Sequence, residues 1–313
     1  MSSYHVPVLL QKIIEISELQ EGRSFVDCTL GGGGHFVPLL QQLNSKGVAI
    51  GVDQDEEALA EVKNKLQSKQ ITLTKDNQNF IFNQVDLRIF LIKQNFNQFE
   101  NLLTIANIEK VDFVLADLGV SSHQLDSNTR GFSFKENQRL DMRMDQNNDG
   151  ATAVDLVNGL YENELERIIR EYGEERYARR IAKEIVEYRK TKKIETTTDL
   201  YNIVQKAVPY KDTKYLKGSA QRVFQALRIL LNDELAALHE LLSQALDKLN
   251  NNGKIAVISY HSLEDRIVKN FIKQNNKVIY KNSIYYPDEE EIASNPRARS
   301  AKLRLIEFRE EVS

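Results

Sequence analysis

The sequence is poor in several features, and each shortage removes a class of protein. It has one cysteine, Cys28, in 313 residues, which excludes a disulfide framework and a cysteine-rich metal site, so we expect no metal. No apolar run approaches the roughly 18 residues that cross a membrane, and the N-terminal segment lacks the pattern of a secretory signal. A net charge of −3 is far from that of a protein that coats nucleic acid. These absences favour a cytoplasmic protein with no membrane contact.

Basic side chains nevertheless gather in two segments. Ten Lys or Arg stand against six Glu between Glu166 and Lys193, and five against one Glu between Asn295 and Arg309. A solvated helix face with internal ion pairs explains the first segment as well as an RNA-binding face does. The second segment, which contains NPRARSAKLR, holds little acid to pair with and favours binding to a polyanion.

Apolar segments alternate with helical patterns, which indicates an α/β fold with a doubly wound, mostly parallel sheet. We predict seven strands, at 25–29, 48–53, 80–86, 111–117, 254–260, 277–281 and 302–308. More than 130 residues separate the fourth strand from the fifth, far more than a crossover needs. Because most of them show helical spacing, we predict an inserted helical subdomain at 126–217 within a core of 1–125 and 218–313. One long helix, from Ala220 to about Leu249, should lead to the fifth strand.

Four glycines, Gly31 to Gly34, follow the first strand and would let the backbone approach a ligand closely. A phosphate-binding P-loop needs GxxxxGK[ST], and His35 and Phe36 follow the glycines instead. The dinucleotide fingerprint G-x-G-x-x-G/A fails as well. Asp27 precedes the glycines, where a carboxylate would repel a pyrophosphate but suit a ligand that carries an ammonium group.

Asp53 ends the second strand, about 20 residues after the glycines, where a carboxylate can accept ribose hydroxyls. Dinucleotide-binding folds share this spacing, so Asp53 alone does not discriminate. Together with Asp27 and the failed pyrophosphate fingerprint, it favours S-adenosylmethionine as the cofactor. An oxidoreductase on a similar sheet is the alternative, and binding of NADH rather than S-adenosylhomocysteine would reveal it.

Asp117 ends the fourth strand, which a doubly wound sheet places beside the first. There it could accept hydrogens from an amine that is being methylated, or contact the cofactor, and both roles are open. His261, after the fifth strand, could help to deprotonate a base or could serve only as a local hydrogen-bonding residue. Cys28 lies in the first strand, where a buried structural role fits better than nucleophilic catalysis.

Nine sequence blocks occur in an order that resembles one known family over nearly the whole chain. They are HVPVLL, VDCTLGGGGH, DLGVSSHQLD, RGFSF, LDMRMD, YGEERYARRIAKEI, FQALRILLNDEL, VISYHSLEDRIVK and NPRARSAKLR. They resemble the bacterial 16S ribosomal RNA cytosine-N4 methyltransferases, which modify a decoding-centre cytidine at ribosomal position 1402. The resemblance implies a class I methyltransferase sheet of seven strands with an inserted helical domain.

The resemblance also implies a set of cofactor-binding residues. They are Gly33, Gly34, His35, Asp53, Leu87, Asp117 and Gln124. Leu87 departs from the family, which usually has a Phe after the third strand. The block KGSAQR at 217–222 stands where many members have His-Pro-Ala-Thr-Arg, and this difference could alter RNA contacts.

The resemblance therefore implies transfer of a methyl group from S-adenosylmethionine to N4 of that cytidine. Asp117 and His261 are the candidate catalytic residues, and the partner is 16S ribosomal RNA or the small ribosomal subunit. The helical insert and the NPRARSAKLR segment would hold the RNA. A non-catalytic ribosome-assembly factor that retains the fold is the alternative from another functional class.

Overall fold

The computed structural model describes residues 7–67, 72–76, 79–84, 86–209, 212–275, 278–279 and 283–308. The chain divides into two compact units, one of Met1–Gly119 with Leu235–Ser313 and one of Val120–Glu234. The second unit extends beyond the predicted range of 126–217 at both ends. No helix in the described ranges is long and apolar enough to cross a membrane.

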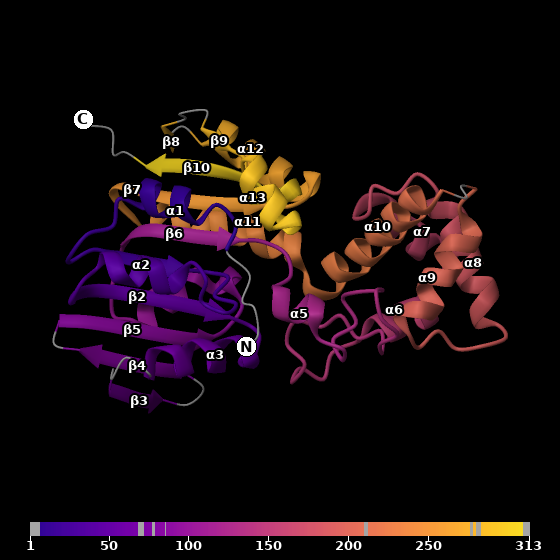
Figure 1. Cartoon of the computed structure of the whole chain (residues 1–313), viewed down its shortest axis with the longest axis horizontal. Coiled ribbons are helices and arrows are strands. Elements are labelled where there is room, and N and C mark those ends of the chain that lie inside the picture. Colours follow the sequence, from indigo (N-terminus) through magenta and orange to yellow (C-terminus); the bar gives the residue numbers. More distant parts are fainter. Residues whose placement is uncertain are drawn as a thin grey trace. The chain divides into compact units, whose positions relative to one another are not determined.

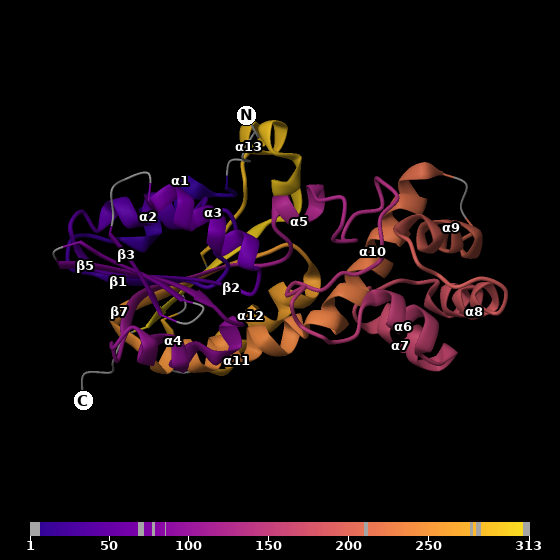
Figure 2. The ribbon, with the colours of Figure 1, turned by 90° about the horizontal axis from the view of Figure 1, so that it is seen from below.

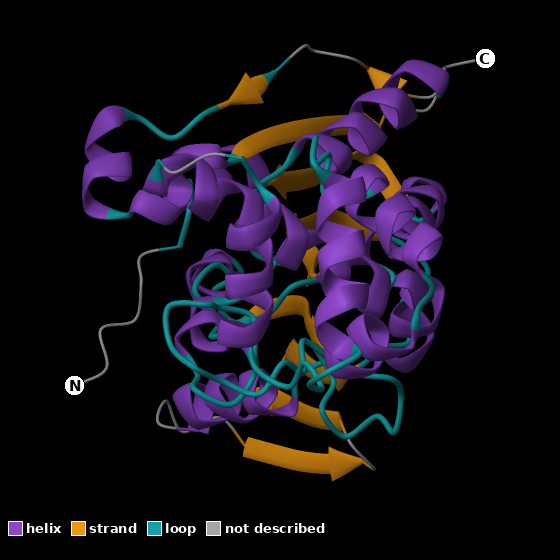
Figure 3. Cartoon of the chain, turned by 90° about the vertical axis from the view of Figure 1, so that its right-hand side faces the viewer, coloured by secondary structure: helices purple, strands orange, loops and turns teal. Residues whose placement is uncertain are grey.

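The first unit is built on a sheet of ten strands, counted over the described residues, in the order β3-β4-β5-β2-β1-β6-β7-β10-β8, with β9 paired to β10 (Figure 1). The five central strands are parallel: β5 (Asp86–Lys93), β2 (Lys46–Asp53), β1 (Ser24–Asp27), β6 (Val111–Asp117) and β7 (Leu249–Ser259). The others are antiparallel to their neighbours: β3 (Thr72–Asp76), β4 (Asn79–Gln84), β8 (Val278–Ile279), β9 (Ile284–Tyr285) and β10 (Lys302–Phe308). Most of the strands stack in one column in Figure 3. The predicted fold class, a mostly parallel doubly wound α/β sheet, is confirmed.

Two details of the predicted strands differ from the structure. The segment predicted as the third strand, 80–86, falls mainly on β4, which runs antiparallel to the next strand, and the third parallel strand is β5. Both segments contain short apolar runs, so periodicity could not show that the first belongs to a β3–β4 hairpin at the sheet edge. This hairpin and β9 bring the sheet to more than the seven strands expected. At the other edge, β8 lies within the predicted strand 277–281, whose remaining residues are outside the described ones.

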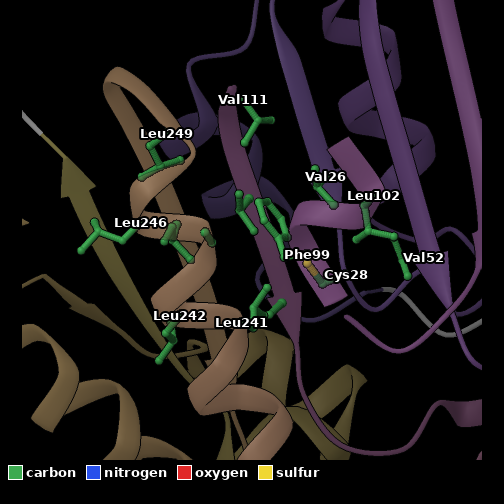
Figure 4. Packing of buried hydrophobic residues seen from close by; sticks show 14 of the residues in the cluster. Val26, Cys28, Val52, Phe99, Leu102, Val111, Leu241, Leu242, Leu246 and Leu249 are labelled. Carbon is green, nitrogen blue, oxygen red and sulfur yellow. The ribbon is translucent and has the colours of Figure 1, made fainter. Parts of the chain in front are cut away.

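Helices cover both faces of this sheet, as Figure 2 shows. One face carries α1 (Leu10–Ser17), α2 (Phe36–Gln42) and α3 (Glu56–Gln67), and the other carries α4 (Phe99–Ile105), α11 (Glu234–Asp247) and α12 (Ser262–Gln274). Parallel strands buried on both faces must be apolar throughout, and residues Ala49, Ile50 and Val52 of β2 are all fully buried. Cys28 is 2% exposed and lies with Val26, Phe99 and Leu102 in one of the two layers of core (Figure 4). Three short elements complete the unit: η1 (Phe96–Gln98), α13 (Glu289–Ser294) and η2 (Pro296–Ser300).

The second unit is helical and has its own core. Its helices are α5 (Ser122–Asp126), α6 (Ala153–Gly159), α7 (Glu162–Glu171), α8 (Ala178–Arg189), α9 (Thr197–Ala207) and α10 (Thr213–Asn232). Fully buried residues such as Leu140, Ile181, Leu200 and Val223 form a separate hydrophobic cluster. A unit with its own core can hold its shape independently of the sheet.

The single long helix predicted from Ala220 to about Leu249 is wrong. Asp233 has a φ of 51°, which ends α10 at Asn232, and α11 begins at Glu234. Asn232 uses its side chain at this break: Oδ1 accepts from Met144 N at 2.8 Å and Nδ2 donates to Met142 O at 2.9 Å. Asp tolerates the left-handed backbone better than most residues, but only these tertiary contacts show that the helix stops here.

Candidate functional site

Three carboxyl groups lie at the carboxyl edge of the parallel strands. Asp27 ends β1 beside Gly51 of β2, Asp53 ends β2, and Asp117 ends β6. Parallel strands point their carboxyl ends to the same edge, so three acids distant in sequence meet there. The predicted grouping of Asp27, Asp53 and Asp117 at one edge is what the structure shows.

The glycine loop between β1 and α2 is tightly packed at Gly33 and Gly34. Gly33 has a φ of +75°, and a Cβ there would lie 2.8 Å from Val62 Cγ2 on α3. A Cβ at Gly34 would lie 3.1 Å from Pro7 Cβ. Lys65 Nζ donates to Gly32 O at 2.7 Å and ties the loop to α3. The loop therefore presents backbone groups rather than side chains to a ligand.

Asp53 organises the start of the glycine loop. Its Oδ2 accepts from Gly31 N at 2.8 Å, and its Oδ1 accepts from Asp55 N at 2.9 Å. Burial raises the pKa of Asp53 to about 6, although both N–H donors favour the ionised form. Each carboxylate oxygen can accept a further hydrogen bond. A pair of vicinal hydroxyls, as on a ribose, fits these remaining positions.

His35 connects the loop to Asp117. Its Nε2 lies 2.9 Å from Val8 O, which can only accept, so Nε2 must carry a proton. Its Nδ1 then faces Asp117 Oδ2 at 3.7 Å. The ring is therefore held by the N-terminal segment on one side and directed at a carboxyl group on the other.

Asp117 is held by two further contacts. Its backbone N donates to Thr29 Oγ1 at 2.7 Å, and Tyr260 Oη donates to its Oδ1 at 2.8 Å. Removal of water raises the pKa of Asp117, while His35 and the Tyr260 hydroxyl act in the opposite direction. Its side chain remains 23% exposed, so the carboxyl group can still meet a ligand.

Tyr260 did not emerge from the sequence as a candidate. It follows β7 directly, within the block SYHSLEDR, and its hydroxyl reaches Asp117 across the edge of the sheet. Burial and the charge of Asp117 raise the pKa of the Tyr260 hydroxyl, so it stays a donor. Its position one residue before His261 was the only signal in the sequence.

Asp27 is the most buried of the three acids, with an exposed fraction of 1%. Its Oδ1 accepts from Thr29 N at 3.1 Å, and burial raises its pKa to about 7, against the opposing effect of His35. The neighbouring Cys28 thiol has a raised pKa because of burial, which keeps it protonated. This is consistent with a structural role for Cys28.

His261 caps α12. Its Nδ1 accepts from Glu264 N at 3.4 Å, and Glu264 Oε2 in turn accepts from Tyr260 N at 2.8 Å and His261 N at 3.2 Å. This reciprocal arrangement is a capping box that sets where the helix begins. The ring thus has the local hydrogen-bonding role that was one of the two alternatives, and a catalytic role for it stays a prediction.

Leu87 does not belong to this edge. It pairs with Gly47 at the start of β5, the opposite end from the Asp53–Lys93 pair, and it is 3% exposed in the core. The prediction was wrong because the third parallel strand begins at Asp86 rather than ending there. Phe96, in η1 just after β5, occupies the place of the aromatic residue that the resemblance implies, and it is partly buried.

Gln124 belongs to the second unit. It lies in α5 and forms a capping box with Ser121, whose N donates to Gln124 Oε1 at 3.1 Å. Gln124 is 5% exposed. Its predicted contact with the cofactor stays a prediction.

Two basic residues of the segment near the C-terminus form ion pairs within the fold. Arg304 Nε donates to Asp265 Oδ1 at 2.6 Å, and Lys302 Nζ lies 3.4 Å from Asp265 Oδ2. Asp265 is on α12, so the acid that pairs with this segment comes from outside it. Arg299 is exposed in η2.

The edge suits one class of ligand. Across the described part of the chain, no Lys or Arg forms an ion pair within 4.0 Å of Asp27, Asp53 or Asp117. Carboxyl groups without a cation repel phosphate but attract hydroxyl donors and positive charge. S-adenosylmethionine carries two ribose hydroxyls, an ammonium and a sulfonium, so these residues fit it.

Comparison with known proteins agrees with this geometry. Residues 2–309 match the family described as the MraW methylase family. The ribosomal RNA small subunit methyltransferase H of Clostridioides difficile (strain 630) is 40% identical and the match covers 98% of this chain and 99% of that protein. The protein of the same name from Finegoldia magna is 39% identical with equal coverage. The match to a methylase family confirms the prediction of S-adenosylmethionine as cofactor.

Proposed function

This chain belongs to the MraW methylase family, and on that premise we propose that it methylates 16S ribosomal RNA of the small subunit at N4 of the cytidine at position 1402. The methyl donor is S-adenosylmethionine, which supplies a methyl group on a positively charged sulfur. The observation that supports the proposal most is Asp117, at the edge where Asp53 and the glycine loop meet. Its carboxyl group accepts from the Tyr260 hydroxyl, and its backbone N donates to Thr29 Oγ1. The names of both relatives describe methyltransferases of small-subunit ribosomal RNA.

The chain's own residues divide the work. Asp53, Gly33, Gly34 and His35 hold the cofactor, with Asp53 accepting from the ribose hydroxyls and the loop offering its backbone. Phe96 is the apolar contact after β5. Nothing in this set needs a phosphate, and the unneutralised carboxyl groups agree with that.

Asp117 supplies the chemistry at the substrate. The amino group of cytosine is a weak nucleophile because its lone pair is delocalised into the ring. An acceptor that binds its hydrogen localises the lone pair and stabilises the positive charge that develops on nitrogen. Asp117 Oδ1 is committed to Tyr260, so Oδ2 is the atom that meets the amine.

A ribosome-assembly factor without catalysis is the alternative. It would not need a carboxyl group held by a partly buried tyrosine, because an ionisable group with a raised pKa costs stability. The raised pKa values of Asp27, Asp53 and Asp117 therefore favour an enzyme.

Mass spectrometry of 16S RNA from cells that lack this protein tests the function. We expect one cytidine N4-methyl mark to disappear and to return when the wild-type gene is supplied. An Asp53→Ala variant should fail to restore it, because the ribose acceptor is gone. Isothermal calorimetry with S-adenosylhomocysteine should show loss of binding by that variant, with its thermal unfolding as a check on folding. An unchanged mark in the deletion strain would refute the proposal.

A further inference from the structure

Nine of the ten basic residues between Glu166 and Lys193, all but Lys193, separate into two groups in the structure. One group is neutralised internally: Arg170 pairs with Glu166 at 2.5 Å, Arg167 with Glu171 at 3.7 Å, and Lys190 with Glu187 at 2.7 Å. Lys192 pairs with Asp199 at 2.9 Å, and Arg189 donates to two carbonyl oxygens. For these residues, the solvated and paired helix face is the correct interpretation.

The other group lies on the first turns of α8 and just before it. Arg176, Arg179, Arg180 and Lys183 are all exposed, and none of them forms an ion pair within 4.0 Å of a carboxylate in the described residues. We name these four residues the Arg176 surface. Arg179 and Lys183 are four residues apart, so they share a helix face and repel each other. The hydrogen bond from Lys190 and the charge of Lys183 lower the pKa of Glu187, but a face of like charges with no direct ion pair is suited to an anionic partner.

Tyr177 arranges two of these arginines. The Arg176 guanidinium carbon lies 5.7 Å from the Tyr177 ring centroid, and that of Arg180 lies 5.8 Å from it. Both guanidinium groups therefore gather around one ring. Contact with an aromatic face limits the freedom of each guanidinium, so less entropy is lost when it binds a phosphate.

Buried Glu175 connects the turn that carries Tyr177 to Arg222. Glu175 is 1% exposed, and its Oε2 accepts from Arg222 Nε at 2.7 Å while its Oε1 accepts from Tyr177 N at 2.8 Å. Gly173 packs against α10, the helix that contains Arg222, since a Cβ at Gly173 would lie 2.7 Å from Arg222 O. Arg222 ends the block KGSAQR, so this block supports the turn through its last residue. The turn next to the Arg176 surface is thus fixed by hydrogen bonds to buried Glu175.

We propose that the Arg176 surface binds the phosphate backbone of the RNA substrate. The inference rests on the proposed function, because that function supplies the polyanion. Arginine forms bidentate hydrogen bonds with phosphate, and phosphate contacts set affinity without reading sequence. The surface therefore holds the RNA, and base selection is made elsewhere.

The test compares two triple variants with the same change in charge. The first, Arg176→Gln/Arg179→Gln/Arg180→Gln, removes the surface, and the control, Arg167→Gln/Arg170→Gln/Lys190→Gln, removes three paired cations of the same unit. Binding to transcribed 16S RNA is measured by filter retention between 50 and 200 mM salt. We expect the first variant to bind about tenfold more weakly at low salt, and its slope of log Kd against log salt to fall by about two, because three phosphate contacts are lost. The control should stay close to wild type.

Thermal unfolding and S-adenosylhomocysteine affinity should be the same in all three proteins, because the substituted side chains are exposed. Equal RNA affinity and equal salt dependence in the two variants would refute the proposal that the Arg176 surface binds RNA. The proposed function fails separately, if the wild-type protein leaves no N4-methyl mark on 16S RNA. The two failures are therefore distinguishable, because one is read from RNA binding by variants and the other from the methyl mark made by the wild type.

Discussion

At the scale of single residues, the Tyr260 hydroxyl is one of the groups that set the pKa of Asp117, after burial and His35. It donates to Asp117 Oδ1 at 2.8 Å, and the other groups that face this carboxyl are His35, Glu264 and Asp27. A hydrogen bond to the ionised form lowers a carboxyl pKa. Tyr260 thus offsets part of the burial that raises it.

Replacement of Tyr260 by Phe should therefore move the pH profile of methyl transfer. The pKa of Asp117 rises when the donor is lost, so the acid limb of kcat shifts to higher pH. The value of kcat at its plateau should fall about tenfold, since hydrogen bonds to charged groups contribute about 1.5–3 kcal/mol. Steady-state kinetics between pH 5.5 and 9 measure both effects.

The same variant separates the two roles considered for Asp117. If Asp117 meets the substrate amine, affinity for S-adenosylhomocysteine at pH 8 stays unchanged, whereas a cofactor contact would weaken it. Tyr285→Phe, which removes a hydroxyl elsewhere in the same unit, is the matched control. A profile identical to wild type would show that Tyr260 does not position Asp117.

Asp27 gives a prediction about stability. Its folded pKa of about 7 is above the ordinary value of 3.8, so the folded state binds its proton more tightly than the unfolded state. The resulting stability is present at low pH and is lost as the pH rises from about 4 to about 7. Asp27→Asn removes the cost of ionising this buried group, and should raise the free energy of unfolding at pH 8 by an amount of the order of 2 kcal/mol.

Urea unfolding at pH 4.5 and pH 8 measures this change. At pH 4.5 the gain should be much smaller, because the Asp27 carboxyl is then mostly protonated in the folded protein. A gain of the same size at both pH values, or a loss at pH 8, would contradict the raised pKa.

At the scale of elements, the glycine loop depends on its contact with α3. Gly33 combines a positive φ with a Cβ position 2.8 Å from Val62 Cγ2, whereas Gly22 has a φ of +83° and no atom within 4 Å of its Cβ position. Gly33→Ala should lose about 2–4 kcal/mol of stability, from backbone strain and overpacking together. Gly22→Ala should lose roughly 1 kcal/mol of stability, because only backbone strain acts there.

Chemical denaturation measures the free energy of unfolding of the two variants. The difference between their losses is the contribution of the steric clash at Gly33. S-adenosylhomocysteine affinity should fall for Gly33→Ala and stay unchanged for Gly22→Ala. Addition of Val62→Ala should recover part of the loss at Gly33, because it removes the clashing methyl group. Equal losses in the two glycine variants would show that the loop is not packed against α3 as described.

The elements also show where sequence patterns stop being informative. The apolar runs predicted β1, β2, β6, β7 and β10 because buried parallel strands and their neighbours must be apolar. The same rule could not separate β4 from β5, since both are apolar and adjacent. That error placed Leu87 after a strand that it begins. The break at Asp233 was missed for a similar reason, because helical periodicity continues through it.

At the scale of the whole molecule, the sequence by itself determined the fold class, the acids at the ends of the strands, and the family. These depend on local order along the chain: strand followed by glycines, acid at a strand end, and nine blocks in one order. Each is readable without knowing which segments touch. The exclusion of phosphate ligands also came from local chemistry, through Asp27 and the failed fingerprints.

Only the tertiary structure decided which groups work together. Tyr260 meets Asp117 across 143 residues, His35 lies between Val8 and Asp117, and Arg222 supports the turn of Tyr177. The structure also separated the paired cations of the second unit from the Arg176 surface, which composition could not do. The physical reason is that hydrogen bonds and ion pairs depend on distances of a few ångström in space, and a sequence records only the distance along the chain.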